Sequence, residues 1–476
     1  MYECIIGLEI HIKLNSKNKL FCKCKNEQEF DNLEPNTHIC PVCTWQPWAL
    51  PVLNEEPFQK AVLLWHILNC RVNNTSAFDR KSYFYPDLPM WYQITQLDRP
   101  TNQEGFVQFY TDNYETENKI RIQRAHIESD AGKTIHQWWW AIVDYNRSGT
   151  PLIEIVTYPD FFDSEQAVQF LKELQRLVRF NNIWYADLEK WQMRCDVNIS
   201  VRQKWSDELW TKVEIKNMNS FSAIKRAINN EFERQVEILE NWWNLDQETR
   251  GWNDDSLSSY TMRSKEDSLD YRYFPEPDLL PLQVSDEYIG QIKQDKIEST
   301  FDKIKKYKEK YWFNKEYINW LIQSKDINFF FEDIISKWAD PKLAANWLVT
   351  EVLWFMNEDI PYIDDFKFSK NQFFQFIKMI QEGKLMQSHG KQVLKEMIST
   401  WKDPNDIVNE KWLIPMDSSE LEKFVDEVIQ ENTTVVDDVK NWQQKAIWFL
   451  VWQVMKKSWW KADPKQVNSI IISKIQ

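Results

Sequence analysis

The segment LEIHIKL, residues 8–14, alternates apolar and polar side chains. In a β-strand this period of two places alternate side chains on opposite faces of the sheet. The apolar face would carry Leu8, Ile10 and Ile12, and the polar face would carry Glu9, His11 and Lys13. The segment therefore predicts a strand with one buried face and one face of ionisable groups.

Three further segments predict strands with a similar polar face. Residues 194–202 read RCDVNISVR and residues 211–217 read TKVEIKN, whereas in residues 151–156, PLIEIV, a single Glu154 interrupts an apolar run. For any one strand, a solvated outer face is the simpler explanation. A sheet whose polar face repeatedly carries carboxylates is instead typical of a platform for hard cations, which take oxygen ligands.

Length and composition indicate a globular protein with more than one domain. The chain has 476 residues, of which 43% are hydrophobic, and a net charge of −14. This hydrophobic content excludes a disordered chain, and a single core rarely exceeds about 250–300 residues. The proline-rich stretch YRYFPEPDLLPL separates mixed strand and helix patterns from Lys/Glu-rich helical patterns. We predict an α+β fold with domains at 1–288, 289–405 and 406–476, the last two all-α.

Signals for export or membrane insertion are not found in the sequence. The N-terminal segment carries Glu3 and Glu9 and no basic stretch, which argues against a secretory signal. No apolar run approaches the roughly 20 residues of a membrane helix. Seven cysteines in a chain of this length do not form a disulfide scaffold. We therefore expect a soluble, cytoplasmic protein.

Glycine and tryptophan occur in unusual numbers. The chain has 8 Gly and 26 Trp, whereas glycine usually makes up about 7% of residues. Several tryptophans stand where turns would take glycine, including Trp45, Trp48 and residues 138–140. Our hypothesis is that most of them are glycines in an organism that decodes UGA as glycine. A truly tryptophan-rich protein that stacks on sugars or bases is the alternative.

Four cysteines have the spacing of a zinc site. Cys22 and Cys24 form one pair, and Cys40 and Cys43 form the second pair after fifteen intervening residues. Paired thiolates at each end of a short loop can close a tetrahedron around Zn²⁺. All four positions of such a site are filled, so we predict a structural zinc ion within an insertion near residues 22–43.

The sequence lacks a phosphate-binding glycine loop, even where Trp is read as Gly. If a nucleotide binds, carboxylates that hold Mg²⁺ would have to grip its phosphates. The candidate ligands are Glu9, His11, Glu128, Glu154, Asp196 and Glu214. No Ser–His–Asp or Cys–His arrangement stands out, which makes a self-contained hydrolase less favoured than metal-assisted phosphoryl transfer.

The C-terminal segment is locally basic in an acidic protein. From Lys440 to the end there are seven lysines and one acid, Asp463. A solvated helical face would explain this pattern, and so would contact with the phosphates of a nucleic acid. We place candidate tRNA contacts at Lys456, Lys457 and Lys461.

Together these motifs resemble the B subunit of tRNA-dependent amidotransferases, the GatB family. The resemblance rests on segments along the chain: residues 7–24, 34–43, 78–89, 126–133, 143–156, 193–201, 214–221, 262–282 and 385–467. The family's motifs have glycine where this chain has Trp45, Trp48, Trp91, Trp448 and Trp452. The resemblance implies a cradle domain similar in fold to glutamine synthetase and guanidino kinases, followed by helical and tail domains.

The resemblance also implies an activity. Such a ligase uses ATP and Mg²⁺ to phosphorylate the side-chain carboxylate of misacylated Glu-tRNA(Gln) or Asp-tRNA(Asn). Ammonia from a partner amidase, the A subunit, then arrives through a channel and displaces phosphate. A small third chain, the C subunit, braces the heterotrimer, and the tail holds the tRNA. A non-catalytic tRNA-binding scaffold is the alternative, and the sequence leaves open which tRNA is the substrate.

Site residues are carried over from the matching motifs. The resemblance places His11, Glu128 and Glu154 in the catalytic set that holds one Mg²⁺ ion. We assign Glu9, Asp196 and Glu214 to a second Mg²⁺ ion. Lys81, Tyr83, Arg147 and Lys216 are candidates for contact with ATP, the acceptor end of tRNA or the channel. One departure is Ser129, which stands where the family usually has a second acid. A ligand role at that position is therefore weakened.

Overall fold

The computed structural model describes residues 2–475, apart from positions 28–29, 182, 184–185, 207, 209, 242, 265–269, 293–298, 358–359, 361, 414–417, 441–443, 459–461 and 463. The chain divides into two compact units, residues 1–306 and residues 307–476. The predicted boundaries at 288/289 and 405/406 stay a prediction. No described helix combines the length and the apolar character needed to cross a membrane.

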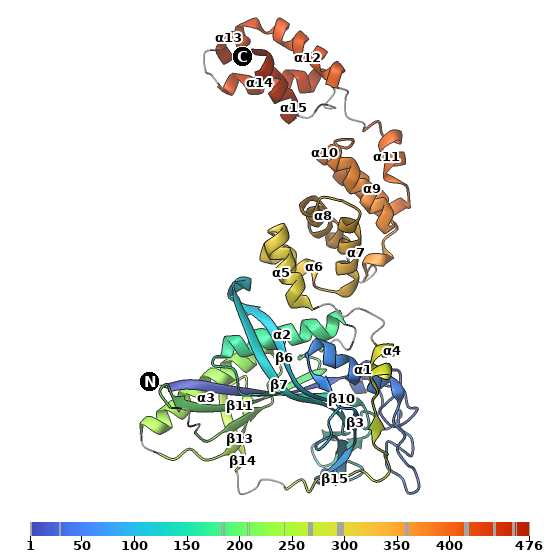
Figure 1. Cartoon of the computed structure of the whole chain (residues 1–476), viewed down its shortest axis with the longest axis vertical. Helices are drawn as coiled ribbons and strands as arrows, with labels where there is room; N and C mark the ends of the chain where they lie inside the picture. Colours follow the sequence, from blue (N-terminus) through green and yellow to red (C-terminus); the bar gives the residue numbers. More distant parts are fainter. Residues whose placement is uncertain are drawn as a thin grey trace. The chain divides into compact units, whose positions relative to one another are not determined.

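A nine-stranded sheet forms the centre of the first unit (Figure 1). Its order is β14-β13-β12-β11-β1-β10-β7-β6-β2. The bounds are β1 Tyr2–Lys13, β2 Arg71–Val72, β6 Asn102–Thr111, β7 Thr116–Ser129, β10 Pro151–Thr157, β11 Met193–Gln203, β12 Val213–Lys216, β13 Glu248–Asn253 and β14 Ser258–Ser264. Only β12 and β13 pair in parallel among these strands. The sheet is therefore mixed, which confirms the predicted α+β class.

Helices α1 (Glu55–Ile67), α2 (Ser164–Phe180) and α3 (Phe221–Glu240) pack against the apolar face of the sheet. Asp163 caps α2 by accepting a hydrogen bond from Gln166 N, and Ser220 caps α3 through Ala223 N. Ile10 of β1 is fully buried in the core that these helices share with the sheet. The polar face of β1 consequently points away from the helices.

Shorter strands flank the polar face. Strands β4 (Asp79–Ser82), β5 (Tyr92–Thr95) and β15 (Phe274–Pro275) form one small sheet, β3 (Thr75–Ser76) pairs with β16 (Leu282–Gln283), and β8 (Lys133–His136) pairs with β9 (Ala141–Asp144). Helices α4 (Asp286–Ile292) and α5 (Thr300–Tyr311) follow them in the chain. The β4–β5–β15 sheet matters for the site, because it carries side chains that contact β7.

The second unit is helical in all its described elements. Its helices are α6 Lys315–Leu321, α7 Lys325–Ser336, α8 Pro341–Trp347, α9 Lys370–Gln381, α10 Gln387–Thr400, α11 Pro404–Glu410, α12 Ser418–Glu431, α13 Thr433–Lys440, α14 Gln444–Lys457 and α15 Pro464–Ile475. Val425, Leu450, Val454 and Ile471 are fully buried in a core that α12 to α15 share.

Eight of the tryptophans that the structure describes adopt positive φ, the region that favours glycine: Trp45, Trp48, Trp91, Trp191, Trp312, Trp338, Trp401 and Trp412. Bulky residues rarely occupy this region because of steric clash, whereas glycine does so freely. Trp338, for example, has φ 71° and is 91% exposed. In contrast, Trp347 is 4% exposed and packs edge-on against Phe376, with ring centroids 5.0 Å apart. The backbone thus supports glycine at the eight positions, whereas side-chain packing supports a true tryptophan at 347.

Candidate functional site

A cavity of about 670 Å³ opens on the polar face of the large sheet. It collects side chains from β1, β4, β7, β10, β11 and β12. All ten residues predicted for Mg²⁺ and nucleotide line it: Glu9, His11, Lys81, Tyr83, Glu128, Arg147, Glu154, Asp196, Glu214 and Lys216. Residues that are distant in the sequence are therefore brought to one place by the strand order β11-β1-β10-β7.

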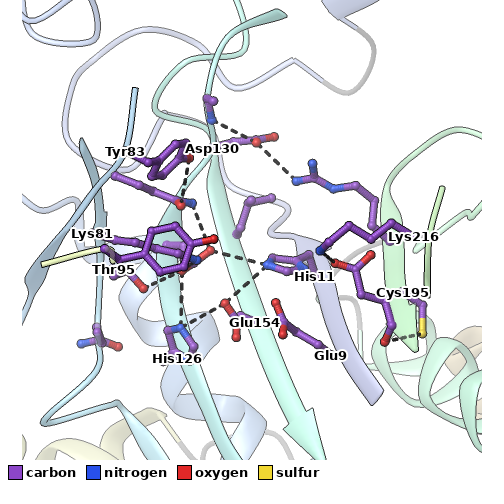
Figure 2. Close-up of a pocket in the computed structure, with 18 of the residues that line it drawn as sticks. Glu9, His11, Lys81, Tyr83, Thr95, His126, Asp130, Glu154, Cys195 and Lys216 are labelled. Carbon is purple, nitrogen blue, oxygen red and sulfur yellow. Dashed lines mark hydrogen bonds and ion pairs between the residues drawn. The ribbon is translucent and has the colours of Figure 1, made fainter. Parts of the chain in front are cut away.

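Two histidines flank Glu154 across the three central strands (Figure 2). The register pairs Glu154 with His11 of β1 on one side and with His126 of β7 on the other. Each histidine Nε2 lies 3.4 Å from Glu154 Oε2. The same two nitrogens lie 3.6 Å and 3.5 Å from carboxylate oxygens of Glu128. The sheet register thus fixes a compact cluster of two carboxylates and two imidazoles.

Glu128 is buried and held by polar groups from β4 and β5. Thr95 Oγ1 donates a hydrogen bond of 2.6 Å to Oε1, and Gln93 Nε2 donates one of 3.0 Å to Oε2. Lys81 Nζ lies 3.9 Å from the same carboxylate. Burial would raise the pKa of Glu128, but the charge of Lys81 and hydrogen bonds from His11 hold it well below its usual range. The carboxyl group is therefore ionised at neutral pH.

The pKa values of the two histidines depend on burial and on the same carboxylates. Burial would lower the pKa of His11, but hydrogen bonds to Glu128 and Glu154 raise it to about 10. His126 is also buried, and the charge of Glu154 with these hydrogen bonds raises its pKa to about 9. Burial and the neighbouring Glu154 raise the pKa of Glu9. The carboxylates thus favour protonated imidazoles at neutral pH, and a bound cation would take the place of these protons.

The donor set fits a hard cation. Ligand atoms of Glu9, His11 and Glu154 lie within 4.8 Å of one another, and so do those of His126, Glu128 and Glu154. Carboxylate oxygens are the ligands that Mg²⁺ prefers.

The sequence-based prediction did not include His126. Its position two residues before Glu128 on β7 puts both on one face of the strand, so the alternation could have identified it.

Asp196 and Glu214, predicted for a second ion, lie beside Lys216. The Lys216 ammonium contacts Asp196 Oδ2 and lies 3.1 Å from Glu214 Oε1. Glu9 faces Asp196 in the β1–β11 register, but its carboxylate groups with His11 and Glu154 instead. Lys216 thus places a positive charge between Asp196 and Glu214, two of the three residues predicted to bind the second ion.

Arg147 and Ser129 are engaged by the protein itself. The Arg147 guanidinium donates to the carbonyls of Ala131 and Gly132, at 3.1 Å and 2.6 Å, and lies 3.4 Å from Asp130 Oδ2. Ser129 Oγ exchanges hydrogen bonds with the backbone N–H and C=O of Ile94. The serine hydroxyl is therefore directed toward β5.

The four predicted zinc ligands also meet. The sulfur atoms of Cys22, Cys24, Cys40 and Cys43 lie within 4.8 Å of one another. Fully buried Lys19 donates to His38 O at 2.9 Å and contacts Cys43 Sγ at 3.7 Å. A hydrogen bond from Cys22, followed by the charge of Lys19, lowers the pKa of Cys43 to about 5. A buried ammonium needs nearby negative charge, and zinc bound by four thiolates would supply it.

Comparisons with known proteins match nearly the whole chain. The GatB/GatE catalytic domain family matches residues 4–290, and the GatB domain family matches residues 329–475. The B subunit of aspartyl/glutamyl-tRNA(Asn/Gln) amidotransferase from Persephonella marina is 41% identical over 472 residues, which cover 99% of this chain and 98% of that protein. The chain belongs to the GatB family of amidotransferase B subunits. The predicted resemblance is thereby confirmed.

Other members of the GatB family are similarly close. The protein of Carboxydothermus hydrogenoformans is 39% identical over 480 residues, covering 100% of this chain and 99% of its own. That of Fusobacterium nucleatum is 38% identical with the same coverage. The match extends across both units, so the helical region is part of the family architecture.

The tail lysines of this family member differ in their surroundings. Lys457 Nζ lies 3.1 Å from Glu427 and 2.6 Å from Glu431, both on α12. Lys456 is exposed. Lys461 lies outside the described residues. Of the two described lysines, Lys456 is the more available to an external phosphate.

Proposed function

We propose that this protein uses ATP to phosphorylate the side-chain carboxylate of misacylated Glu-tRNA(Gln), Asp-tRNA(Asn) or both, and then forms the amide. The observation that carries the proposal is the cluster of Glu154, Glu128, His11 and His126 in one cavity. Membership of the GatB family supports a transamidation role over a non-catalytic scaffold.

The chemistry requires two anions, ATP and a carboxylate, to meet. Mg²⁺ held by His11, Glu128 and Glu154, with Glu9, Asp196 and Glu214 for a second ion, would neutralise the phosphates. Lys81 and Lys216 line the same cavity and add positive charge beside it. Buried hydrogen bonds from Thr95 and Gln93 keep Glu128 oriented, while the charge of Lys81 and hydrogen bonds from His11 keep it ionised. Tyr83 and Arg147 also line the cavity, and we assign Arg147 to the support of the site.

Ammonia must come from elsewhere, because the proposed substrate supplies none. As a member of the GatB family, the chain is one part of a multi-subunit enzyme. We propose a cytoplasmic heterotrimer with a glutaminase, the A subunit, which hydrolyses glutamine, and with the small C subunit. The helical tail would hold the tRNA through Lys456 and its neighbours, and the four cysteines would hold a structural zinc ion.

The test reconstitutes the complex from genes with glycine at the UGA codons. Glu-tRNA(Gln), Asp-tRNA(Asn), ATP, Mg²⁺ and glutamine are supplied, and amidated tRNA and ADP are measured. Wild type should form amide, whereas Glu154→Ala should lose the product. Glu165→Ala is the matched control, because its carboxylate pairs with Lys225 on the helical side. An assembled, tRNA-binding complex that forms no ADP with either tRNA would favour the scaffold.

A further inference from the structure

The four cysteines lie within residues 19–43, the cysteine lobe. Between residues 22 and 43 its one described helical element is the three-residue turn Phe30–Asn32. A segment with so little regular structure has few backbone hydrogen bonds of its own. Its shape therefore depends on cross-links between its ends, such as a shared metal ion at the cysteines.

Asn36 of the cysteine lobe is bonded to the end of β9. Its backbone N–H donates to Asp144 Oδ1, its side-chain amide donates to Val143 O, and its side-chain oxygen accepts from Tyr145 N. All three distances are 2.9 Å. One side chain thus pairs with the chain on both sides of Asp144, as a neighbouring strand would.

Four more residues of the lobe contact the loop 144–150, which joins β9 to β10. Fully buried Asn146 accepts a hydrogen bond from His38 N at 2.8 Å and donates one to Glu34 O at 2.7 Å. Ser148 Oγ donates to Cys43 O at 2.9 Å. The backbone also takes part, because Leu20 N donates to Gly149 O at 2.8 Å.

The loop in turn holds one end of the cavity. Gly149 N donates to Asp130 O at 2.9 Å, and Asp130 N donates to Thr150 O at 2.8 Å. Arg147 reaches from the loop to Asp130, which also contacts Arg194 at 3.3 Å. These three charged residues line the cavity. Strand β10, which carries Glu154, begins directly after the loop.

We infer that the cysteine lobe is a brace for the catalytic cavity: metal bound at the four cysteines fixes loop 144–150 and, through it, Arg147 and Asp130. Asn36 and Asn146 are positioning residues in this brace. The inference rests on the proposed zinc site. In this brace the metal acts on the cavity without touching the substrate. Loss of the metal should therefore loosen loop 144–150 before the rest of the large sheet.

The test measures amide hydrogen exchange in the purified complex alongside its zinc content. Removing zinc with a chelator should speed exchange at Tyr145, Ser148 and Gly149 at least tenfold, while amides in the centre of β11 stay unchanged. If zinc is bound and its removal leaves these amides equally protected, the brace is wrong. A protein that holds no zinc would overturn the zinc-dependent part of the inference together with the metal site.

A second variant tests the brace without touching the cysteines. Asn36 has φ 61°, so Asn36→Gly keeps the backbone conformation and removes the side-chain bonds to Val143 and Tyr145. The variant should retain zinc, show faster exchange at Tyr145, and raise the KM for ATP or tRNA severalfold. Thr37→Ala is the control, since the exposed Thr37 hydroxyl bonds only within the lobe among the described contacts. Unchanged exchange and kinetics in Asn36→Gly would refute the brace even if zinc is absent.

Discussion

His11 lies directly opposite Glu154 in adjacent antiparallel strands, with Nε2 3.4 Å from Oε2. His126 takes the corresponding position on the opposite side of Glu154. The separation of these side chains is set by backbone hydrogen bonds of the sheet, so little reorganisation is needed when a ligand arrives. A site built on paired strands is held more firmly than one built on loops.

Replacing His126 should weaken the cation site without abolishing it. His126→Asn removes a nitrogen that lies 3.5 Å from Glu128 and 3.4 Å from Glu154, so both carboxylates lose an orienting partner. Loss of such outer partners typically costs about 10–100-fold in metal affinity. The Mg²⁺ concentration for half-maximal amide formation should rise within this range, while saturating Mg²⁺ restores most of kcat. A full loss of kcat at every Mg²⁺ concentration would instead make His126 a catalytic residue.

Asp130 should make the protein sensitive to acid. Burial would raise the pKa of Asp130, but Arg147 and Arg194 lower it below its usual value. A carboxylate of this kind stabilises the fold above its unfolded pKa of about 3.9, and the effect is lost as pH falls through the lower folded pKa. At neutral pH, Asp130→Asn should reduce the free energy of unfolding by about 1–3 kcal/mol.

Urea unfolding of both proteins between neutral pH and about pH 3 checks this sign. The difference in free energy of unfolding between wild type and Asp130→Asn should shrink on acidification. A difference that grows as the pH falls would show that folding raises the pKa of Asp130 instead of lowering it.

The two tail lysines should behave differently. Lys456→Glu places a negative charge at an exposed position, so tRNA affinity should fall and the salt dependence of binding should become shallower by about one phosphate contact. Lys457 is paired with Glu427 and Glu431, so Lys457→Glu should mainly loosen the contact between α14 and α12. Filter binding at several salt concentrations, with circular dichroism as a folding control, separates the effects. Equal binding by wild type and Lys456→Glu would remove this lysine from the tRNA contact.

Peptide mass analysis of the native protein tests the glycine hypothesis position by position. Peptides that span positions 312, 338, 401 and 412 should carry glycine, because the backbone there has positive φ. The peptide with position 347 should carry tryptophan, since its ring packs against Phe376. Tryptophan at all five positions would refute the UGA assignment.

Much of the site followed from the period of two in the strands. The alternation in residues 8–14 placed Glu9 and His11 together on the polar face of β1, where the structure also has them. Strand order could not be obtained in this way, because pairing of β1 with both β10 and β11 joins segments about 140 and 190 residues apart. The resemblance to the family supplied that long-range information, because it assigned Glu128 and Glu154 to one metal site with His11.

The hydrogen-bond and ion-pair partners of the site residues were harder to predict than which residues line the site. Lys216 lies between Asp196 and Glu214, and Arg147 donates to backbone carbonyls. These partners depend on side-chain conformation and on loops that no periodicity describes. The same holds for Asn36, whose three bonds to β9 and the following loop have no sequence signature. Lys457 likewise has its partners on α12, outside the basic segment that singled it out.

The central claim is that the side-chain carboxylate of the substrate is phosphorylated in this cavity. Its most direct test uses misacylated tRNA with a heavy-oxygen label in that carboxylate, together with the whole complex, ATP, Mg²⁺ and glutamine. If an acyl phosphate forms and ammonia displaces it, one labelled oxygen should appear in inorganic phosphate for each amide formed. Amide formation with phosphate that carries no label would contradict the account.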